Sequence, residues 1–446
     1  MTAPPTAGTV GRTPGRVLVL CLICMTLEGY DIVAYGAALP AILAYDDWGL
    51  TIAGAGLIGS LTPVGMLVGA SASGVLTDSL GRRRVVLVSV TVFTVAALMS
   101  AFAPNALVFG VSRVLVGLGV GAVLPTVSAL VYEYSPPGQR NLNTAIVFSG
   151  VGIGGGLAAA AAVFVLPSLG FRSEFAIGGL AGIVLLPLVF RYLPESLMFL
   201  TSVGRGDEAQ RLSRRLGLDP ALAHIDHDDR PQPLRGAERL SILLSRQFRL
   251  TTILLCLATF SSLLLIFGLS TWLPVLMRAA GYPLGSALSF LAVLSVGTAF
   301  GPLAFGKLAD NVGSKVAVLV AFSLAIAGIV GLSFPLPTVL LYIAIAIAGA
   351  ATNGVQVLLN VLIGTRYPTR IRATAIGAAL SVGRLGAISG PLLGSILIGA
   401  HLQPALNFYA IAATALLGMT CTAAIPPLRR PINGPAASSN RAAGQH

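Results

Sequence analysis

Charged side chains are scarce in this chain. Asp, Glu, Lys and Arg make up only 10% of its 446 residues, whereas hydrophobic residues make up 55% and the mean hydropathy is +0.87. Soluble domains carry about 25% charged residues, because their surface must face water. A chain with so little polar surface cannot cover a soluble globule of this size, so lipid has to cover the remainder. The composition therefore excludes a conventional soluble protein and predicts an all-α membrane protein.

Metal ligands and redox pairs are also few. The four cysteines, among them the CxxC pair Cys21 and Cys24, lie in apolar stretches and are interpreted as small apolar helix residues. His224 and His227 stand beside aspartates in the polar stretch 194–249, where a solvated linker is not expected to hold a metal. The apolar stretches contain no nucleophile–base pair and no set of metal ligands. We therefore expect neither an enzyme nor a bound cofactor or metal.

Twelve apolar stretches are long enough to cross a bilayer, whose core needs about 20 residues of helix. They lie at 17–43, 52–77, 85–103, 106–132, 141–166, 173–193, 250–277, 285–308, 316–335, 338–365, 373–399 and 405–426. The predicted organisation is an N-terminal six-helix half (1–193), a cytoplasmic linker with a short amphipathic helix (194–249), a C-terminal six-helix half (250–426) and a cytoplasmic tail (427–446).

The positive charges predict an orientation. Of the 28 Lys and Arg residues, only Arg172 and Arg278 fall on one side of the predicted membrane, and only Arg113 and Arg384 fall within spans. The rest gather on the other side, which the positive-inside rule assigns to the cytoplasm together with both termini. Because the net charge of +12 is spread over short loops, nucleic acid is not an expected partner.

The two predicted halves repeat one another. The segment GVLTDSLGRRR, from Gly74 to Arg84, is echoed by GKLADNVGSK, from Gly306 to Lys315, so that Asp78 recurs as Asp310 at a constant offset. Parallel repeats of six spans are how one large class of transporters builds two halves around a central binding site.

Four charges break this symmetry, because Glu28, Asp31, Arg113 and Arg384 align with uncharged residues of the opposite half. A charge in mid-membrane costs about 2.5–3.5 kcal/mol on insertion scales. The other half manages without them, which favours a functional role. Salt bridges that lock helices together are the alternative, above all for Arg113.

The two acids and Arg384 have complementary chemistry. Glu28 and Asp31 are three residues apart, on one face of a helix. Two carboxylates so close cannot both ionise cheaply, so one is expected to keep its proton near neutral pH. Arg384 carries a planar fork of donors that grips a carboxylate at two points. One half thus offers a proton site and the other an anion site.

Several segments resemble a known superfamily. GVLTDSLGRRR resembles the loop between spans 2 and 3 of the major facilitator superfamily, RVLVGLGVGAVLP (113–125) its span 4 signature, and PESLMFL (194–200) the end of its span 6. Two further segments narrow the match: EGYD (28–31) and YPTRIRATAIGAALSVGRLGAISGP (367–391) resemble the aromatic acid:proton symporters. Members of that family import benzoate, hydroxybenzoates, protocatechuate, gentisate or related acids with protons.

The resemblance implies roles for matching positions. Glu28 and Asp31 would carry the proton, and Asp31, Arg384 and Tyr35 would bind the substrate. Other aromatic residues, such as Phe267, are candidates for stacking on the substrate ring. Gating loops and charge networks would comprise Asp78, Arg82, Arg113, Glu133, Asp310 and Arg372. The expected protein is a monomer in a bacterial plasma membrane, with an aromatic carboxylate and protons as its partners.

Departures from the family pattern leave alternatives open. Glu28 stands where the family commonly has Asp, Ser79 where it often has a basic residue, and Ala375 where it has Gly. The longer Glu28 side chain leaves the identity of the substrate open. The alternatives are a sugar or aliphatic acid transporter, a drug efflux antiporter, or a membrane sensor that binds aromatic acids without transporting them.

Overall fold

The computed structural model describes residues 12–216, 236–400 and 403–426, and these residues form helices without any β-strand. Within this part of the chain, twelve helices are long and apolar enough to cross a membrane. The predicted all-α fold with twelve spans is therefore confirmed. His224 and His227 lie outside the described residues.

The first group of helices runs from the start of the described chain to Tyr192. It comprises α1 (Arg12–Leu43), η1 (Asp46–Trp48), α2 (Ile52–Leu80), α3 (Arg82–Ala101), α4 (Ala106–Tyr134), η2 (Pro137–Gln139), α5 (Arg140–Leu169) and α6 (Phe171–Tyr192).

Three short helices of the linker precede a second group of long helices. The short ones are α7 (Leu197–Ser202), α8 (Gly206–Leu216) and α9 (Gly236–Leu243). The long ones are α10 (Arg249–Ala279), α11 (Leu284–Val312), α12 (Ser314–Gly331), α13 (Thr338–Arg366), α14 (Thr369–Gly399) and α15 (Pro404–Ala423).

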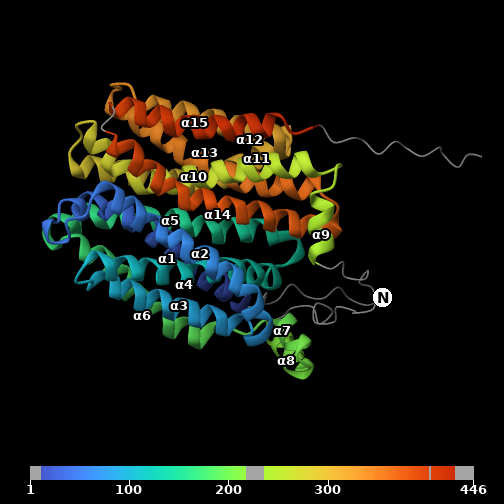
Figure 1. Cartoon of the computed structure of the whole chain (residues 1–446). Helices are drawn as coiled ribbons and strands as arrows, with labels where there is room; N and C mark the ends of the chain where they lie inside the picture. Colours follow the sequence, from blue (N-terminus) through green and yellow to red (C-terminus); the bar gives the residue numbers. More distant parts are fainter. Residues whose placement is uncertain (1–11, 217–235, 401–402, 427–446) are drawn as a thin grey trace, which may run out of the picture.

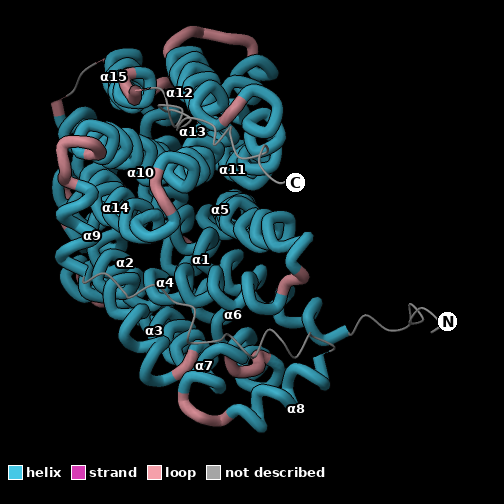
Figure 2. The backbone as a smooth tube through the Cα atoms, turned by 90° about the vertical axis from the view of Figure 1, so that its right-hand side faces the viewer, coloured by secondary structure: helices cyan, strands magenta, loops and turns pink. Residues whose placement is uncertain are grey.

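The two groups of long helices lie side by side (Figure 1), and seen along the helix axes the second group lies above the first (Figure 2). Within the first group, α1 packs on α5 and α2 on α4, and within the second, α10 packs on α14 and α11 on α13. These are corresponding pairs, as the internal repeat predicts. The groups meet where α1 contacts α10, α2 contacts α14 and α5 contacts α11.

Glycines shape the two repeated loops. Gly81 ends α2 with φ 88°, and Gly313 ends α11 with φ 85°. A residue with a Cβ atom rarely adopts this left-handed conformation, whereas glycine does so readily. The chain therefore turns sharply from α2 into α3 and from α11 into α12. These loops lie at the same end of the molecule as α7, α8 and α9, which we call the loop end (Figure 1).

The groups approach one another closely at the end remote from the loops, here called the far end. Gly36 of α1 lies against the Ser270 carbonyl of α10, and Gly56 of α2 lies against the Ser395 side chain of α14. A Cβ atom at either glycine would overlap these neighbours. The absence of side chains at these points is therefore what allows the far end to close.

The loop end is open by comparison. Cβ atoms added at Gly74, Gly306 or Gly377 would meet nothing within 4 Å. Asp78 at the end of α2 and Asp310 at the end of α11 are both exposed. The glycine contacts thus bring the two groups together at the far end, whereas these glycines of the loop end make no such contact.

Replacing Gly36 with alanine should destabilise this arrangement. The added methyl group overlaps the backbone of α10, and overpacking of this kind costs about 1–3 kcal/mol. Gly377→Ala is the matched control, because it adds the same group in open space and improves helix propensity by up to about 1 kcal/mol. Thermal unfolding of the purified protein would measure both, and equal melting temperatures for the two variants would contradict the prediction.

Candidate functional site

Helix α1 carries two acidic side chains into the centre of the bundle. Glu28 is 4% exposed and Asp31 is 3% exposed, so neither reaches bulk water. Since α1 packs against α4, α5 and α6 of its own group and against α10 of the other, its acids can meet basic groups from either side. The structure gives them different partners.

Asp31 forms an ion pair within the first group of helices. Both Asp31 carboxylate oxygens accept hydrogen bonds from the Arg113 guanidinium of α4, at 2.8 and 2.7 Å. The guanidinium also lies over the rings of Tyr35 and Phe175, with 5.8 and 5.5 Å to the ring centroids. Arg113 is only 1% exposed. A bidentate pair flanked by two aromatic faces stabilises both charges away from water, although the Arg113 Nε atom has no hydrogen-bond partner among the described residues.

Glu28 lacks such a partner in its own group. Its Oε2 atom is buried without a hydrogen bond. The positive charge that acts on it is Arg384 of α14, in the second group. Arg384 forms no ion pair with the described residues, and its Nη1 atom lies 3.7 Å from the Met66 sulfur of α2. Glu28 and Arg384 thus belong to different groups of helices, and neither forms an ion pair with the described residues.

The Tyr35 side chain packs within the first group of helices. Its hydroxyl donates a 2.6 Å hydrogen bond to the Ala55 carbonyl of α2, and its ring stacks on Phe109 at 6.2 Å. The structure thus places Tyr35 beside Arg113 and not beside Arg384. Its contact with the guanidinium supports the Asp31–Arg113 pair.

The loop end of the first group carries a second charge network. Arg82, at the start of α3, forms an ion pair with Glu133, near the end of α4. The Ser196 hydroxyl donates a 2.8 Å hydrogen bond to the same carboxylate. Of the predicted network residues, Arg82 and Glu133 are thus brought together, while Asp78 remains exposed.

Glu195 extends this network, although no role was predicted for it. Its carboxylate accepts a 3.0 Å hydrogen bond from the Arg83 backbone N–H, and its carbonyl accepts a 2.7 Å hydrogen bond from the Tyr134 hydroxyl. The PESLMFL segment was the sequence signal for this position. Glu195 thus links the α2–α3 turn to the segment that follows α6.

The equivalent loop of the second group is built differently. Lys315 donates hydrogen bonds to the carbonyls of Ala423 and Ile425, at 2.9 and 2.7 Å. Arg372 approaches only the Tyr367 carbonyl, at 3.5 Å, and Asp310 is exposed. None of the described residues of this loop forms an ion pair. The loops of the two groups are thus similar in sequence, but their side chains form different contacts.

Glu174 is a buried acid that sequence reasoning missed. It is 0% exposed in the first turn of α6, and both of its carboxylate oxygens lack a hydrogen-bond partner. The Tyr30 hydroxyl of α1 donates a 3.0 Å hydrogen bond to its backbone carbonyl. The residue stands at the predicted start of a span, where an acid is expected to be exposed. Only the packing of α1 and α3 against α6 buries it.

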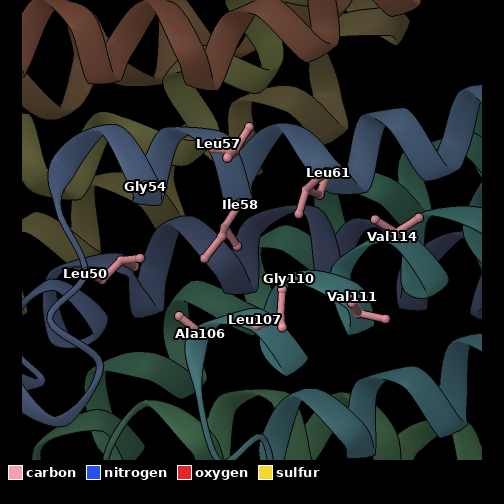
Figure 3. A pocket seen from close by; sticks show the side chains of 10 residues that line it. All are labelled: Leu50, Gly54, Leu57, Ile58, Leu61, Ala106, Leu107, Gly110, Val111 and Val114. Atoms are coloured by element: carbon pink, nitrogen blue, oxygen red, sulfur yellow. The ribbon is translucent and has the colours of Figure 1, made fainter.

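A groove of about 480 Å³ between α2 and α4 is separate from these charges (Figure 3). Its walls carry only apolar side chains and glycine, including Leu57, Ile58 and Val111. It includes none of the predicted site residues.

A smaller cavity lies between the two groups of helices. It measures about 50 Å³ and is lined by residues of α1, α5, α10, α11 and α13, including Gly29, the neighbour of Glu28. Unlike the groove, it carries polar side chains, all of them from the second group.

Comparison with known proteins identifies the family. The model of the Major Facilitator Superfamily matches residues 21–391. The chain belongs to the Major Facilitator Superfamily. It is therefore a multi-pass membrane transporter and not an enzyme, as predicted.

Similar proteins narrow this assignment. The benzoate transport protein of Acinetobacter baylyi is 33% identical over 91% of this chain and 88% of its own length. The gentisate transporter of Corynebacterium glutamicum is 34% identical over 92% and 87%. The 4-hydroxybenzoate transporter of Pseudomonas aeruginosa is 32% identical over 86% of each chain. The predicted membership of the aromatic acid transporter family is confirmed.

Solved structures agree on the fold. The xylose transporter XylE from E. coli, in an inward open conformation, has a TM-score of 0.75 over 93% of this chain and 96% of its own, at 15% identity. The xylose transporter and the present chain thus share one fold.

Breaking the Asp31–Arg113 pair should destabilise this facilitator strongly. Asp31→Asn or Arg113→Gln leaves the remaining charge buried without its partner, which costs about 3–5 kcal/mol. The double variant should lose less than the sum of the single variants, because no unpaired charge remains. Thermal unfolding of all three variants in one lipid mixture measures the coupling.

The exposed Arg205–Glu208 pair supplies the control for this comparison of single and double variants. Its side chains are about half exposed, and ion pairs of this kind contribute only about 0.2–1 kcal/mol. Glu208→Gln should therefore change the melting temperature little. Additive losses at Asp31 and Arg113 would show that the two side chains do not stabilise each other.

Proposed function

We propose that this facilitator imports an aromatic carboxylate together with protons, by alternating access of its two groups of helices. The observation that carries the proposal is the position of Arg384. It is a permanently charged side chain at the interface between the groups, without an ion pair among the described residues. A half-buried guanidinium of this kind attracts a carboxylate, which it can hold at two points.

The names of the relatives support an aromatic acid as the substrate. Proteins named for the transport of benzoate, gentisate and 4-hydroxybenzoate each align with most of this chain. These molecules share a carboxylate on an aromatic ring. The carboxylate would bind Arg384, and the ring would lie among the apolar side chains between the groups.

Proton coupling is assigned to the acids of α1. Glu28 faces Arg384 and has a free oxygen, so a proton on Glu28 would release Arg384 for the substrate carboxylate. Asp31 is paired with Arg113 in the described conformation, so its part in coupling would require α4 to move against α1. One proton with one monovalent anion moves no net charge. Uptake would then be driven by the pH gradient, at about 1.4 kcal/mol per pH unit.

The loop end is proposed to face the cytoplasm. Most Lys and Arg residues lie at this end, and cytoplasmic loops of membrane proteins carry such an excess. Both termini and the linker would then be cytoplasmic, in the plasma membrane of a bacterium, and the facilitator would act as a monomer. Since the groups touch at the far end, the described conformation would be the one that is open to the cytoplasm.

Uptake by cells that express the protein tests this function. Labelled benzoate, 4-hydroxybenzoate, protocatechuate and gentisate would be supplied with and without a protonophore. We expect at least one acid to accumulate in a protonophore-sensitive way. Arg384→Ala should abolish accumulation, and Arg384→Lys should restore it only in part, because Lys lacks the planar fork. Arg278→Ala, at an exposed arginine of α10, should transport normally.

Glu28→Gln separates coupling from binding. Glutamine cannot release a proton, so this variant should bind and exchange the acid but no longer concentrate it. Full accumulation by Glu28→Gln would contradict the proton assignment. Failure of every acid to accumulate in wild-type cells would contradict the aromatic acid assignment, and uptake of a sugar, export of a drug or binding without transport would then replace it.

A further inference from the structure

The cavity between the two groups of helices has two different walls. The wall from α1 and α5 consists of glycine and aliphatic side chains. The opposite wall carries five polar residues: Ser270 of α10, Ser295 and Thr298 of α11, and Thr352 and Asn353 of α13. No charged residue lines the cavity. Its chemistry therefore suits a neutral polar group and not the carboxylate of a substrate.

Most hydroxyl groups of this polar wall already donate a hydrogen bond within the protein. Ser295, Thr298 and Thr352 each donate to a backbone carbonyl of their own helix, at 2.9, 3.0 and 3.1 Å. A hydroxyl that donates in this way still has lone pairs with which to accept. The wall thus presents oxygen acceptors to the cavity.

Asn353 adds another acceptor. Its amide nitrogen donates a 2.9 Å hydrogen bond to the Thr298 carbonyl, which orients the side chain. Its carbonyl oxygen has no hydrogen bond with the described residues. Ser270 differs, because its hydroxyl forms no hydrogen bond with the described residues and can either donate or accept. A phenolic hydroxyl, which donates one proton and accepts in return, matches this set of groups.

The cavity and Arg384 lie at different levels along α10. Gly386, two residues from Arg384, packs on Phe260 of α10. The cavity is lined by α10 residues from Ile266 to Ser270, which lie six to ten positions further along that helix. At 1.5 Å per residue this is an axial offset of about 9–15 Å towards the far end. A substrate held at Arg384 would have to extend over this offset for its ring substituent to reach the polar wall.

We propose that the polar wall binds a ring hydroxyl, so that the facilitator selects hydroxylated aromatic acids over unsubstituted benzoate. The inference rests on the proposed function, with the carboxylate bound at Arg384. A cavity of about 50 Å³ exceeds the roughly 10–15 Å³ that a cavity needs to hold one water. It accommodates a hydroxyl substituent. Without that hydroxyl, benzoate leaves the acceptors of the wall unpaired.

Transport kinetics in proteoliposomes test the selection. The Michaelis constant would be measured for benzoate, 3-hydroxybenzoate, 4-hydroxybenzoate and gentisate under an imposed pH gradient. The wild-type protein should prefer at least one hydroxylated acid to benzoate by about tenfold, the effect of one well-placed hydrogen bond. The preference should appear in the Michaelis constant and not in the maximal rate, because the contact binds the ring.

Variants of Thr352 and Asn353 locate the contact. Thr352→Val and Asn353→Leu remove acceptors at nearly constant volume, and each should raise the Michaelis constant for the hydroxylated acid towards that for benzoate. The constant for benzoate should not rise, because these variants remove acceptors that benzoate leaves unpaired, and retained benzoate transport also shows that the variants fold. Thr352→Ser keeps the hydroxyl and should keep the preference. Thr365→Val, which removes a hydroxyl of α13 outside the cavity, should behave like the wild type.

The possible results separate the two proposals. Equal transport of benzoate and all hydroxylated acids by the wild type would overturn the selection but leave the proposed function standing. A preference that survives in both Thr352→Val and Asn353→Leu would also overturn the role of this wall. If no aromatic acid is transported, the proposed function itself fails.

Discussion

Buried charge is the constraint on which the centre of this transporter depends. A guanidinium or carboxylate away from water is tolerated only with a partner of opposite charge and satisfied hydrogen bonds. The Asp31–Arg113 pair supplies the partner of opposite charge within the first group of helices, beside the rings of Tyr35 and Phe175. Glu28 forms no ion pair in the first group, and Arg384 of the other group forms none with the described residues. The chemistry of transport is thereby concentrated at the interface.

The same interface is where the molecule moves in the proposed mechanism. At the far end, glycines let the backbones of α1 and α2 approach α10 and α14. At the loop end, the glycines of the same long helices face open space. A contact surface made of small residues can form and separate without large side chains having to repack. The charges of Glu28 and Arg384 then lie where the two groups change their distance.

The two halves share a fold but contribute different side chains to the centre of the molecule. The first half holds both acids of the centre, the Asp31–Arg113 pair and the network of Arg82 with Glu133. The second half supplies Arg384 and the polar wall of the small cavity. Its loop lacks an ion pair among the described residues, although Asp310 repeats Asp78. The repeated scaffold thus carries different polar and charged side chains in its two halves.

Hydrophobicity along the chain determined the twelve spans, because a helix in lipid must satisfy its backbone internally and be apolar over its whole length. The four intramembrane charges were equally visible, since each stands out against an apolar background. Sequence spacing placed Glu28 and Asp31 on one helix face, which predicted that both acids act as a pair.

Only the tertiary structure decided how those charges are partnered. Arg113 lies 82 positions from Asp31 in the chain, and nothing local to either residue predicts that they meet. Only the packed structure shows that Tyr35 lies beside Arg113, and Glu174 became a buried acid only through helix packing. The reason is physical: hydropathy is a property of each segment, whereas a salt bridge or a cavity wall belongs to several helices and exists only once they are packed.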